Sequence, residues 1–146
     1  MFQDIKIRPA LPTDYDGIVS IDDISQVKQN RRDFIRRTIE EGYAYAAISG
    51  DTILGYGVLE YTFFESGYIS MLLVANIYRR NGVGSLLMRH MESICATEKL
   101  FTSTNLSNTP MQALLNKLGY KVSGFIDNLD EGDPELIYFK HQERNI

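Results

Sequence analysis

Seven consecutive residues of the chain have the composition of an anion-binding loop. The run Arg79-Arg80-Asn81-Gly82-Val83-Gly84-Ser85 follows an apolar segment and precedes a stretch with helical spacing. The first N–H groups of a helix lack internal partners and lie at the positive end of its dipole, and glycine lets a phosphate approach the backbone closely. The run therefore predicts a phosphate cradle, although two neighbouring glycines are also compatible with an ordinary tight turn.

The loop matches neither of two common phosphate-binding motifs. No Gly-Lys-Ser/Thr follows it, so it is not a P-loop, and its spacing differs from the G-x-G-x-x-G of dinucleotide-binding folds. The one cysteine, Cys95, and the two histidines, His90 and His141, show no metal-ligand spacing. We therefore expect no metal, and we interpret Cys95 as a packed core side chain.

The composition is that of a soluble globular protein. The chain has 146 residues, of which 44% are hydrophobic and 23% charged, and its formal net charge is −4. This predicts a single domain over residues 1–146. Nucleic acid is not an expected partner, because a duplex-binding surface needs a basic excess. The arginines of residues 31–37 are followed by two glutamates and are interpreted as a solvated helix face.

Targeting signals are not expected either. No apolar run approaches the roughly 20 residues that span a bilayer, so no membrane association is predicted. The first nine residues carry charges and lack the apolar core of a signal peptide, and a single cysteine fits a reducing compartment. The sequence therefore predicts a cytoplasmic protein.

Six elements must lead up to the loop. They are a strand over 4–8, a helix from Thr13, a helix over 30–41, and strands over 43–49, 52–63 and 68–75. Thr13 and Asn30 are the expected N-caps, and Ile24 is expected to close the apolar stripe of the first helix. The turn before the last strand is expected at 65–67. That strand is nearly all apolar, which predicts cover on both faces.

Five further elements are predicted after the loop's first residues. They are a helix over 82–97, a strand over 100–104, a helix over 110–118, and strands over 120–126 and 135–140. An acidic turn over 129–134 joins the last two strands. The order is βααβββαβαββ, which predicts an α+β fold around a mixed sheet.

Two motifs then resemble a known family. Arg79-x-x-Gly82-x-Gly84 resembles the Q/R-x-x-G-x-G/A motif of the GNAT superfamily of N-acetyltransferases. Asn108-x-x-Met111-x-x-Leu-Leu-x-Lys117-Leu118-Gly119-Tyr120 is similar to that family's N-x-x-A-x-x-L-Y-x-K-x-G-F segment. The resemblance covers nearly the whole element order. It implies a GNAT-like three-layer sandwich, in which helices flank a central mixed, largely antiparallel sheet.

The resemblance also implies acetyl-CoA as cosubstrate. Family members surround its pyrophosphate with the amides of the loop and pair the preceding strand with its pantetheine arm. A backbone N–H near Val74 would polarise the acetyl carbonyl. The implied cofactor-binding residues are Leu73, Val74, Arg79, Arg80, Asn81, Gly82, Val83, Gly84, Ser85, Asn105 and Asn108.

Two catalytic groups of the family are missing here. The tyrosine that protonates the leaving thiolate aligns with Leu115, and residues 68–74 contain no carboxylate. Glu60 is the expected base and Tyr120 the expected acid, with Tyr61 and Tyr68 as weaker candidates. The alternative interpretations are an outward-facing glutamate and a core tyrosine.

The resulting hypothesis is an N-acetyltransferase that moves acetyl directly, in a ternary complex, to a primary amine of a small molecule. A protein N-terminus or lysine as acceptor, a non-catalytic acyl-CoA-binding module, and a domain whose loop binds nothing are the alternatives. The carboxylates Asp130, Glu131, Asp133 and Glu135 would steer a cationic amine or simply form a charged hairpin. Family members often pair, so a homodimer is one option, although no residue singles out an interface.

Overall fold

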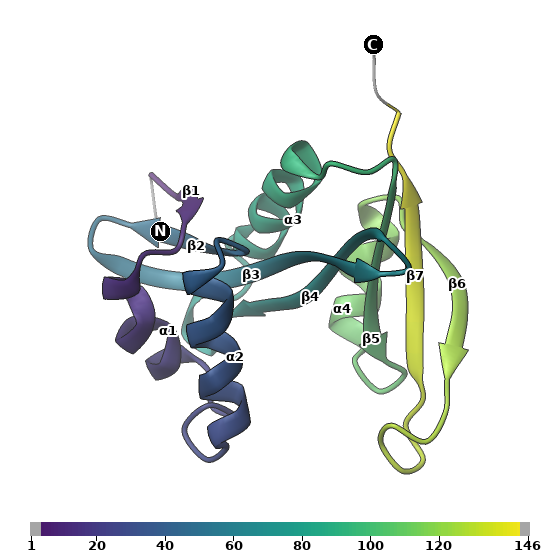
Figure 1. Ribbon diagram of the computed structural model, residues 1–146, viewed down its shortest axis with the longest axis horizontal. Helices are drawn as coiled ribbons and strands as arrows, with labels where there is room; N and C mark the ends of the chain where they lie inside the picture. Colours follow the sequence, from purple (N-terminus) through teal and green to yellow (C-terminus); the bar gives the residue numbers. More distant parts are fainter. Residues whose placement is uncertain (1–3, 144–146) are drawn as a thin grey trace. The chain divides into compact units, whose positions relative to one another are not determined.

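The computed structural model describes residues 4–143, and these form two compact units. The first contains the residues up to Leu59 together with Met71–Ser93, and the second contains Glu60–Ser70 and the residues from Ile94 onward. Strands β3 and β4, labelled in Figure 1, each have residues in both units. A single domain over the whole chain stays a prediction.

The described residues confirm the predicted fold class. The strands are β1 (Lys6–Pro9), β2 (Ala44–Ser49), β3 (Thr52–Phe63), β4 (Ser66–Val74), β5 (Lys99–Asn105), β6 (Lys121–Ile126) and β7 (Glu135–His141). The α-helices are α1 (Tyr15–Ile21), α2 (Gln29–Glu40), α3 (Val83–Ile94) and α4 (Thr109–Lys117), and short 3₁₀ turns η1 and η2 cover Pro12–Asp14 and Asn76–Tyr78. The strand order is β1-β2-β3-β4-β5-β7-β6. The pair β4–β5 is parallel, while β1–β2, β2–β3, β5–β7 and β6–β7 are antiparallel.

The core of the first unit joins α1 and α2 to β2 and β3. Ile18, Ile35 and Val58 belong to one buried cluster, and each is almost fully removed from water. Two glycines in β3 permit close packing. A Cβ at Gly55 would lie 2.6 Å from the Leu73 carbonyl oxygen, and one at Gly57 would lie 2.6 Å from the Met91 methyl group of α3. A larger residue at Gly55 would collide with the backbone of β4, and one at Gly57 would push against the Met91 side chain of α3.

The second unit places α4 against β7. Leu115 of α4 is fully buried, and the Lys140 ammonium on β7 donates to the Leu118 carbonyl at 2.8 Å. Near the start of β4, Gly67 lies against Cys95, because a Cβ at Gly67 would be 2.5 Å from the Cys95 Sγ. Cys95 is fully buried, as expected of a core side chain.

The start of the first helix differs from the prediction. Residues 12–14 form the turn η1, and α1 begins only at Tyr15, so Thr13 is not its N-cap. The Asp14 carboxylate stabilises the start of this segment instead. It accepts from the Leu11 N–H at 2.7 Å and pairs with Arg8 at 2.6 Å. The helix also ends at Ile21, which leaves Ile24 outside it and 45% exposed.

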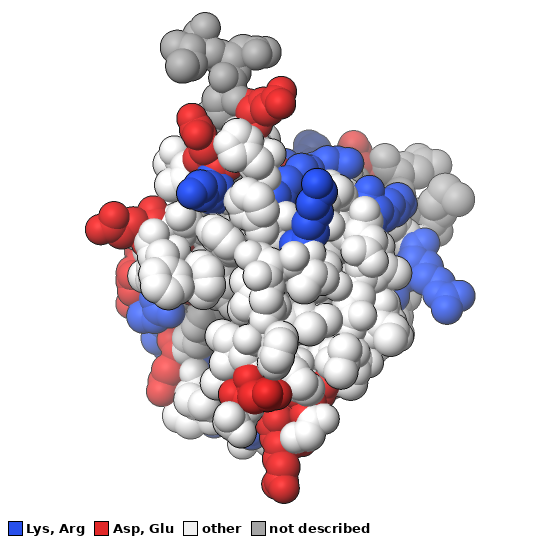
Figure 2. Space-filling model, turned by 90° about the vertical axis from the view of Figure 1, so that its right-hand side faces the viewer, with Lys and Arg blue, Asp and Glu red and all other residues white. Residues whose placement is uncertain are grey.

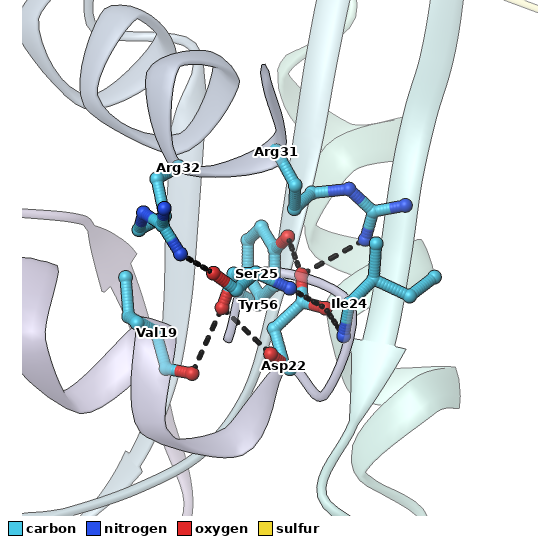
Figure 3. A network of polar contacts seen from close by, with 7 residues as sticks. All are labelled: Val19, Asp22, Ile24, Ser25, Arg31, Arg32 and Tyr56. Atoms are coloured by element: carbon cyan, nitrogen blue, oxygen red, sulfur yellow. Dashed lines mark hydrogen bonds and ion pairs between the residues drawn. The ribbon is translucent and has the colours of Figure 1, made fainter. Parts of the chain in front are cut away.

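The loop between α1 and α2 is held by a buried carboxylate (Figure 3). Asp22 is fully buried and accepts from the Tyr56 hydroxyl at 2.7 Å and from Arg31 at 2.9 Å. Arg32 donates to the carbonyl of Ser25 in the same loop. The prediction of a solvated arginine face is therefore wrong for Arg31 and Arg32, which tie the loop to α2. The N-cap of α2 is Lys28 and not Asn30.

Two further boundaries move. The hairpin turn lies at Phe64 and Glu65, which both adopt positive φ, so the predicted turn at 65–67 is one residue late and β4 already begins at Ser66. Helix α3 ends at Ile94 and not at 97, and Ile94 is exposed. β4 is also not buried throughout, because only Gly67 and Ile69 are removed from solvent. None of the helices formed by residues 4–143 is long and apolar enough to cross a membrane.

Candidate active site

The predicted cradle is an exposed loop of the first unit that ends in the N-terminus of α3. Arg80 and Gly82 both adopt left-handed backbone conformations, with φ of +66° and +79°. Asn81 braces the turn through its side-chain amide, which donates to the Tyr78 and Arg79 carbonyls at 3.0 and 3.1 Å. A non-glycine residue at positive φ carries strain that is often found at functional sites.

The first helical hydrogen bond of α3 runs from the Leu86 N–H to the Gly82 carbonyl, at 3.1 Å. The N–H groups of Val83, Gly84 and Ser85 therefore precede the i→i−4 ladder, as in any helix N-terminus. A Cβ at Gly82 would meet nothing within 4 Å, so the space beside it is open. Arg79 and Arg80 are exposed beside it. These features fit a pyrophosphate, which needs N–H donors, positive charge and close backbone approach.

Leu73 and Val74 form the last residues of β4 before the loop, and both are half-buried. The Arg79 Nε–H donates to the Val74 carbonyl at 3.4 Å, a long contact. The strand end and the loop are thus linked within the first unit. Their predicted contacts with the pantetheine arm stay a prediction.

The two asparagines have partners within the second unit. The Asn108 Oδ1 caps α4 by accepting from the Met111 N–H at 3.2 Å. The Asn105 Nδ2 donates to Asp130 at 2.9 Å, which ties the end of β5 to the β6–β7 loop. Both side chains therefore order loops, and their roles toward a cofactor stay predictions.

Glu60 is not an outward-facing residue. It lies on β3, is only 7% exposed, and its Oε2 accepts from the Ser70 hydroxyl at 2.6 Å. Burying a carboxylate costs free energy unless it is hydrogen-bonded, and the Ser70 hydroxyl supplies such a bond. The role of Glu60 as a base stays a prediction.

The C-terminal end of α4 positions Tyr120 and Leu115. Gly119, at φ +91°, follows the helix, and the Tyr120 N–H donates to the Leu115 carbonyl at 2.9 Å. With the Gly119 N–H bonded to Asn116, this is a Schellman motif, which commonly packs its last residue against the helix. Tyr120 is accordingly 3% exposed, and its ring centroid lies 5.4 Å from the Lys140 Nζ. The core interpretation explains its burial, and its role as an acid stays a prediction.

Tyr68 and Ser103 form a polar pair in the second unit, and from the sequence Tyr68 was only a weaker catalytic candidate. The Tyr68 hydroxyl of β4 lies 2.7 Å from the Ser103 Oγ of β5. Burial raises the pKa of Tyr68, so the phenol stays neutral. The sequence feature that could have indicated this pair is the alternation of side chains, which puts Tyr68 and Ser70 on one face of β4. The parallel pairing of β4 with β5 then brings Ser103 to the same face. The Tyr61 hydroxyl, in contrast, accepts from the Ala96 N–H.

The acidic turn is largely occupied by local bonds. Asp133 accepts from both the Ser107 N–H at 3.0 Å and the Ser107 hydroxyl at 2.6 Å, and Asp130 accepts from Asn105. These contacts favour the charged-hairpin interpretation for Asp130 and Asp133.

A cavity of about 630 Å³ opens in the first unit. It is lined by α1, the β2–β3 turn and η2, and its wall includes Arg8, Asp51 and Tyr78 but none of the site residues expected from the sequence. Within residues 4–143, no three His, Cys, Asp or Glu side chains gather so as to hold a metal ion.

Comparison with known proteins defines the class. The model of the acetyltransferase (GNAT) family matches residues 11–120. A crystal structure of a GNAT family acetyltransferase from Bacillus cereus ATCC 10987 is 36% identical, with a TM-score of 0.89, and covers 97% of this chain and 100% of that one. The chain belongs to the GNAT acetyltransferase family.

Two other known proteins are similar to this chain. An N-alpha-acetyltransferase of Sulfurisphaera tokodaii is 25% identical, over 82% of this chain and 81% of the relative. The structure of yncA from Salmonella typhimurium with its cofactor acetyl-CoA has a TM-score of 0.77 at 14% identity, and covers 98% of this chain and 96% of that one. At that identity the second comparison shows the fold alone.

Proposed function

We propose that this acetyltransferase moves acetyl from acetyl-CoA to the primary amine of a small molecule. The observation that carries the donor assignment is the loop before α3, with Gly82 at φ +79°, open space beside it and two exposed arginines. A relative of the same fold with acetyl-CoA as cofactor supports it. The amides of Arg80 to Ser85 would hold the pyrophosphate, Leu73, Val74 and Asn108 would bind the pantetheine arm, and Asn105 would contact the cofactor.

The chemistry is direct attack of the amine on the thioester carbonyl. A C–N bond forms, the C–S bond breaks, the amine loses a proton, and the leaving thiolate takes one up. Glu60, held by the Ser70 hydroxyl, is the proposed acceptor of the amine proton. Tyr120 is the proposed proton donor, and Tyr68, whose hydroxyl lies 2.7 Å from the Ser103 Oγ, is a second candidate.

A protein N-terminus is the second candidate acceptor. The observation that favours it is the likeness to the N-alpha-acetyltransferase of Sulfurisphaera tokodaii. Thiol release measured with acetyl-CoA and a panel of polyamines, amino sugars and short peptides with free N-termini separates the two. Turnover confined to the peptides would replace the small-molecule proposal.

The donor assignment is tested by Gly82→Asp. The carboxylate would fill the open space and repel a pyrophosphate, so calorimetry should show at least about tenfold weaker CoA binding, which is ~1.4 kcal/mol. Gly42→Asp is the matched control. Gly42 has φ +80° and likewise no atom within 4 Å of an added Cβ, so the backbone strain is the same but CoA affinity should not change. Equal CoA affinity of wild type and Gly82→Asp would refute the cradle.

A further inference from the structure

Ser70 is the more accessible member of a hydrogen-bonded pair in the second unit. Its hydroxyl donates to the Glu60 Oε2 at 2.6 Å. Glu60 is only 7% exposed, whereas Ser70 is half-buried. An amine that approaches this pair from solvent therefore meets the serine hydroxyl before it meets the carboxylate.

Ser70 also lies at the point where the pairing between β4 and β5 ends. The parallel pairing takes in Gly67 to Ile69 of β4, although β4 continues to Val74 and β5 to Asn105. Ser70 is thus the first residue of β4 beyond the paired stretch. Its side chain lies beside a place where the two strands have stopped holding each other.

A second hydroxyl pair lies on the same face of the sheet. Tyr68 and Ser70 are two apart on β4 and so share a face. The Tyr68 hydroxyl lies 2.7 Å from the Ser103 Oγ of β5. The opposite face of β4 packs against Cys95 at Gly67. The two hydroxyl pairs therefore lie on the face that Cys95 does not cover.

Negative charge acts on these hydroxyl groups. Burial is the main cause that raises the pKa of Tyr68, and the charges of Glu135 and Glu60 act in the same direction, against the Ser103 hydrogen bond. Both carboxylates are therefore close enough to influence the phenol. Their charge would also attract a protonated amine to this face.

The exposed carboxylates beside β6 and β7 are less suited to act as a base. Asp130 and Asp133 accept from Asn105 and Ser107, at 2.9 and 2.6 Å. Figure 2 faces that side of the molecule and shows charged side chains mostly around a broad area that carries few of them. Glu60 inside the sheet is therefore the better placed acceptor for the proton of an amine.

We propose that Ser70 relays the amine proton to Glu60. The proton on the amine nitrogen passes to the Ser70 Oγ while the Ser70 hydroxyl proton passes to the Glu60 Oε2. One N–H and one O–H bond break, and two O–H bonds form. The serine ends unchanged, Glu60 ends protonated, and the neutral amine attacks the thioester. The same path later returns the proton to solvent. The relay rests on the proposed function, because it needs an amine acceptor.

The experiment is a proton inventory of acetyl transfer. The rate with the most active amine of the panel is measured in mixtures of H₂O and D₂O, under single-turnover conditions that separate chemistry from product release. Two protons that move together give a curved plot of rate against deuterium fraction, and one proton gives a straight line. The wild type should give the curve. Ser70→Ala should be slower by roughly 10²-fold and give the straight line, while Ser70→Thr, which keeps a hydroxyl, should keep the curve.

A double variant separates a relay from a structural support. If Ser70 and Glu60 share one proton path, Ser70→Ala combined with Glu60→Gln should be no slower than the slower single variant. Ser66→Ala is the matched control. Ser66 is a half-buried serine on the same face of β4, four residues earlier, so its variant should keep the wild-type rate and the curved plot.

The outcomes distinguish the relay from the proposed function. A straight plot for the wild type, a wild-type rate in Ser70→Ala, or effects that multiply in the double variant would overturn the relay and leave acetyl transfer in place. If no amine of the panel releases CoA thiol, the proposed function is removed and the relay with it.

Discussion

Leu115 is the residue at which the chain departs from its family's chemistry. It occupies the position of the usual tyrosine, yet it is fully buried in the second unit and its carbonyl accepts from the Tyr120 N–H. A leucine side chain has only C–H bonds, so it packs the helix and cannot donate a proton. The proposed proton transfer therefore uses other groups, and Glu60, which accepts from the Ser70 hydroxyl, is the proposed acceptor.

The role of Glu60 predicts a loss of rate in Glu60→Gln. An amide keeps the size and the bond to Ser70 but cannot accept a proton, so kcat should fall by roughly 10²-fold. The acidic limb of the pH–rate profile should flatten. Glu65→Gln, in the exposed β3–β4 turn, is the control and should behave as wild type. An unchanged profile in Glu60→Gln would remove this residue from the mechanism.

Asp14 predicts a pH-dependent stability. Its hydrogen bond with Arg8 lowers the pKa of the carboxyl below its ordinary value, with the Leu11 N–H acting in the same direction. The stabilisation is therefore present above the unfolded pKa of about 3.9 and is lost as the pH falls through the folded value. Asp14→Asn should be less stable than wild type by about 2 kcal/mol at pH 7. Urea unfolding should show the difference shrinking below about pH 4; a constant difference would contradict the ionic origin.

At the scale of elements, helix ends explain both the successes and the failures of prediction. Gly119 after α4 and Gly42 after α2 end their helices as expected, since both adopt positive φ. The first residues of the helices were harder to predict. Asp14 and Lys28 stand where Thr13 and Asn30 were expected, because Asp14 is bonded to Arg8 and Lys28 follows a loop fixed by buried Asp22. Such long-range partners leave no local signal.

Because α4 ends in a Schellman motif, we expect a side chain at position 119 to strain the backbone and destabilise the fold. Gly119→Ala forces a side chain into φ +91°, with only the Lys140 Cε at 4.0 Å nearby, so the cost is strain rather than collision. We expect a loss of about 1 kcal/mol in the free energy of unfolding by urea. Gly124→Ala is the matched control, because a Cβ there meets nothing within 4 Å and needs no positive φ. Equal effects of the two substitutions would contradict the account.

At the scale of the whole molecule, neither unit is a continuous stretch of chain. The chain leaves the first unit within β3 and returns within β4. We therefore expect one cooperative unfolding transition by calorimetry. Saturation with CoA at about 100 times its Kd should raise the free energy of unfolding by about 2.7 kcal/mol. Two transitions, of which CoA shifts only one, would contradict this coupling.

Much of this organisation could be predicted from the sequence. The loop over residues 79–85 and the α4 segment carry the two motifs from which the family followed, and the element order followed from the hydrophobic periodicity. The register of β6 could not be predicted, because Ser123 and Gly124 give no local sign of the bulge that turns Phe125 to the face of Val122. The pairing of Tyr68 with Ser103 depends on a crossover between parallel strands, which spacing alone does not reveal.

Because Gly67 packs against Cys95, the rate at which this cysteine is labelled measures how often the second unit opens. The chain has a single thiol, and that thiol is fully buried against Gly67. A thiol reagent can reach it only in molecules whose second unit has transiently opened. When reclosing is fast, the labelling rate divided by the rate for a free thiol gives the open population directly. No engineered label is needed to follow that opening in the presence of substrates.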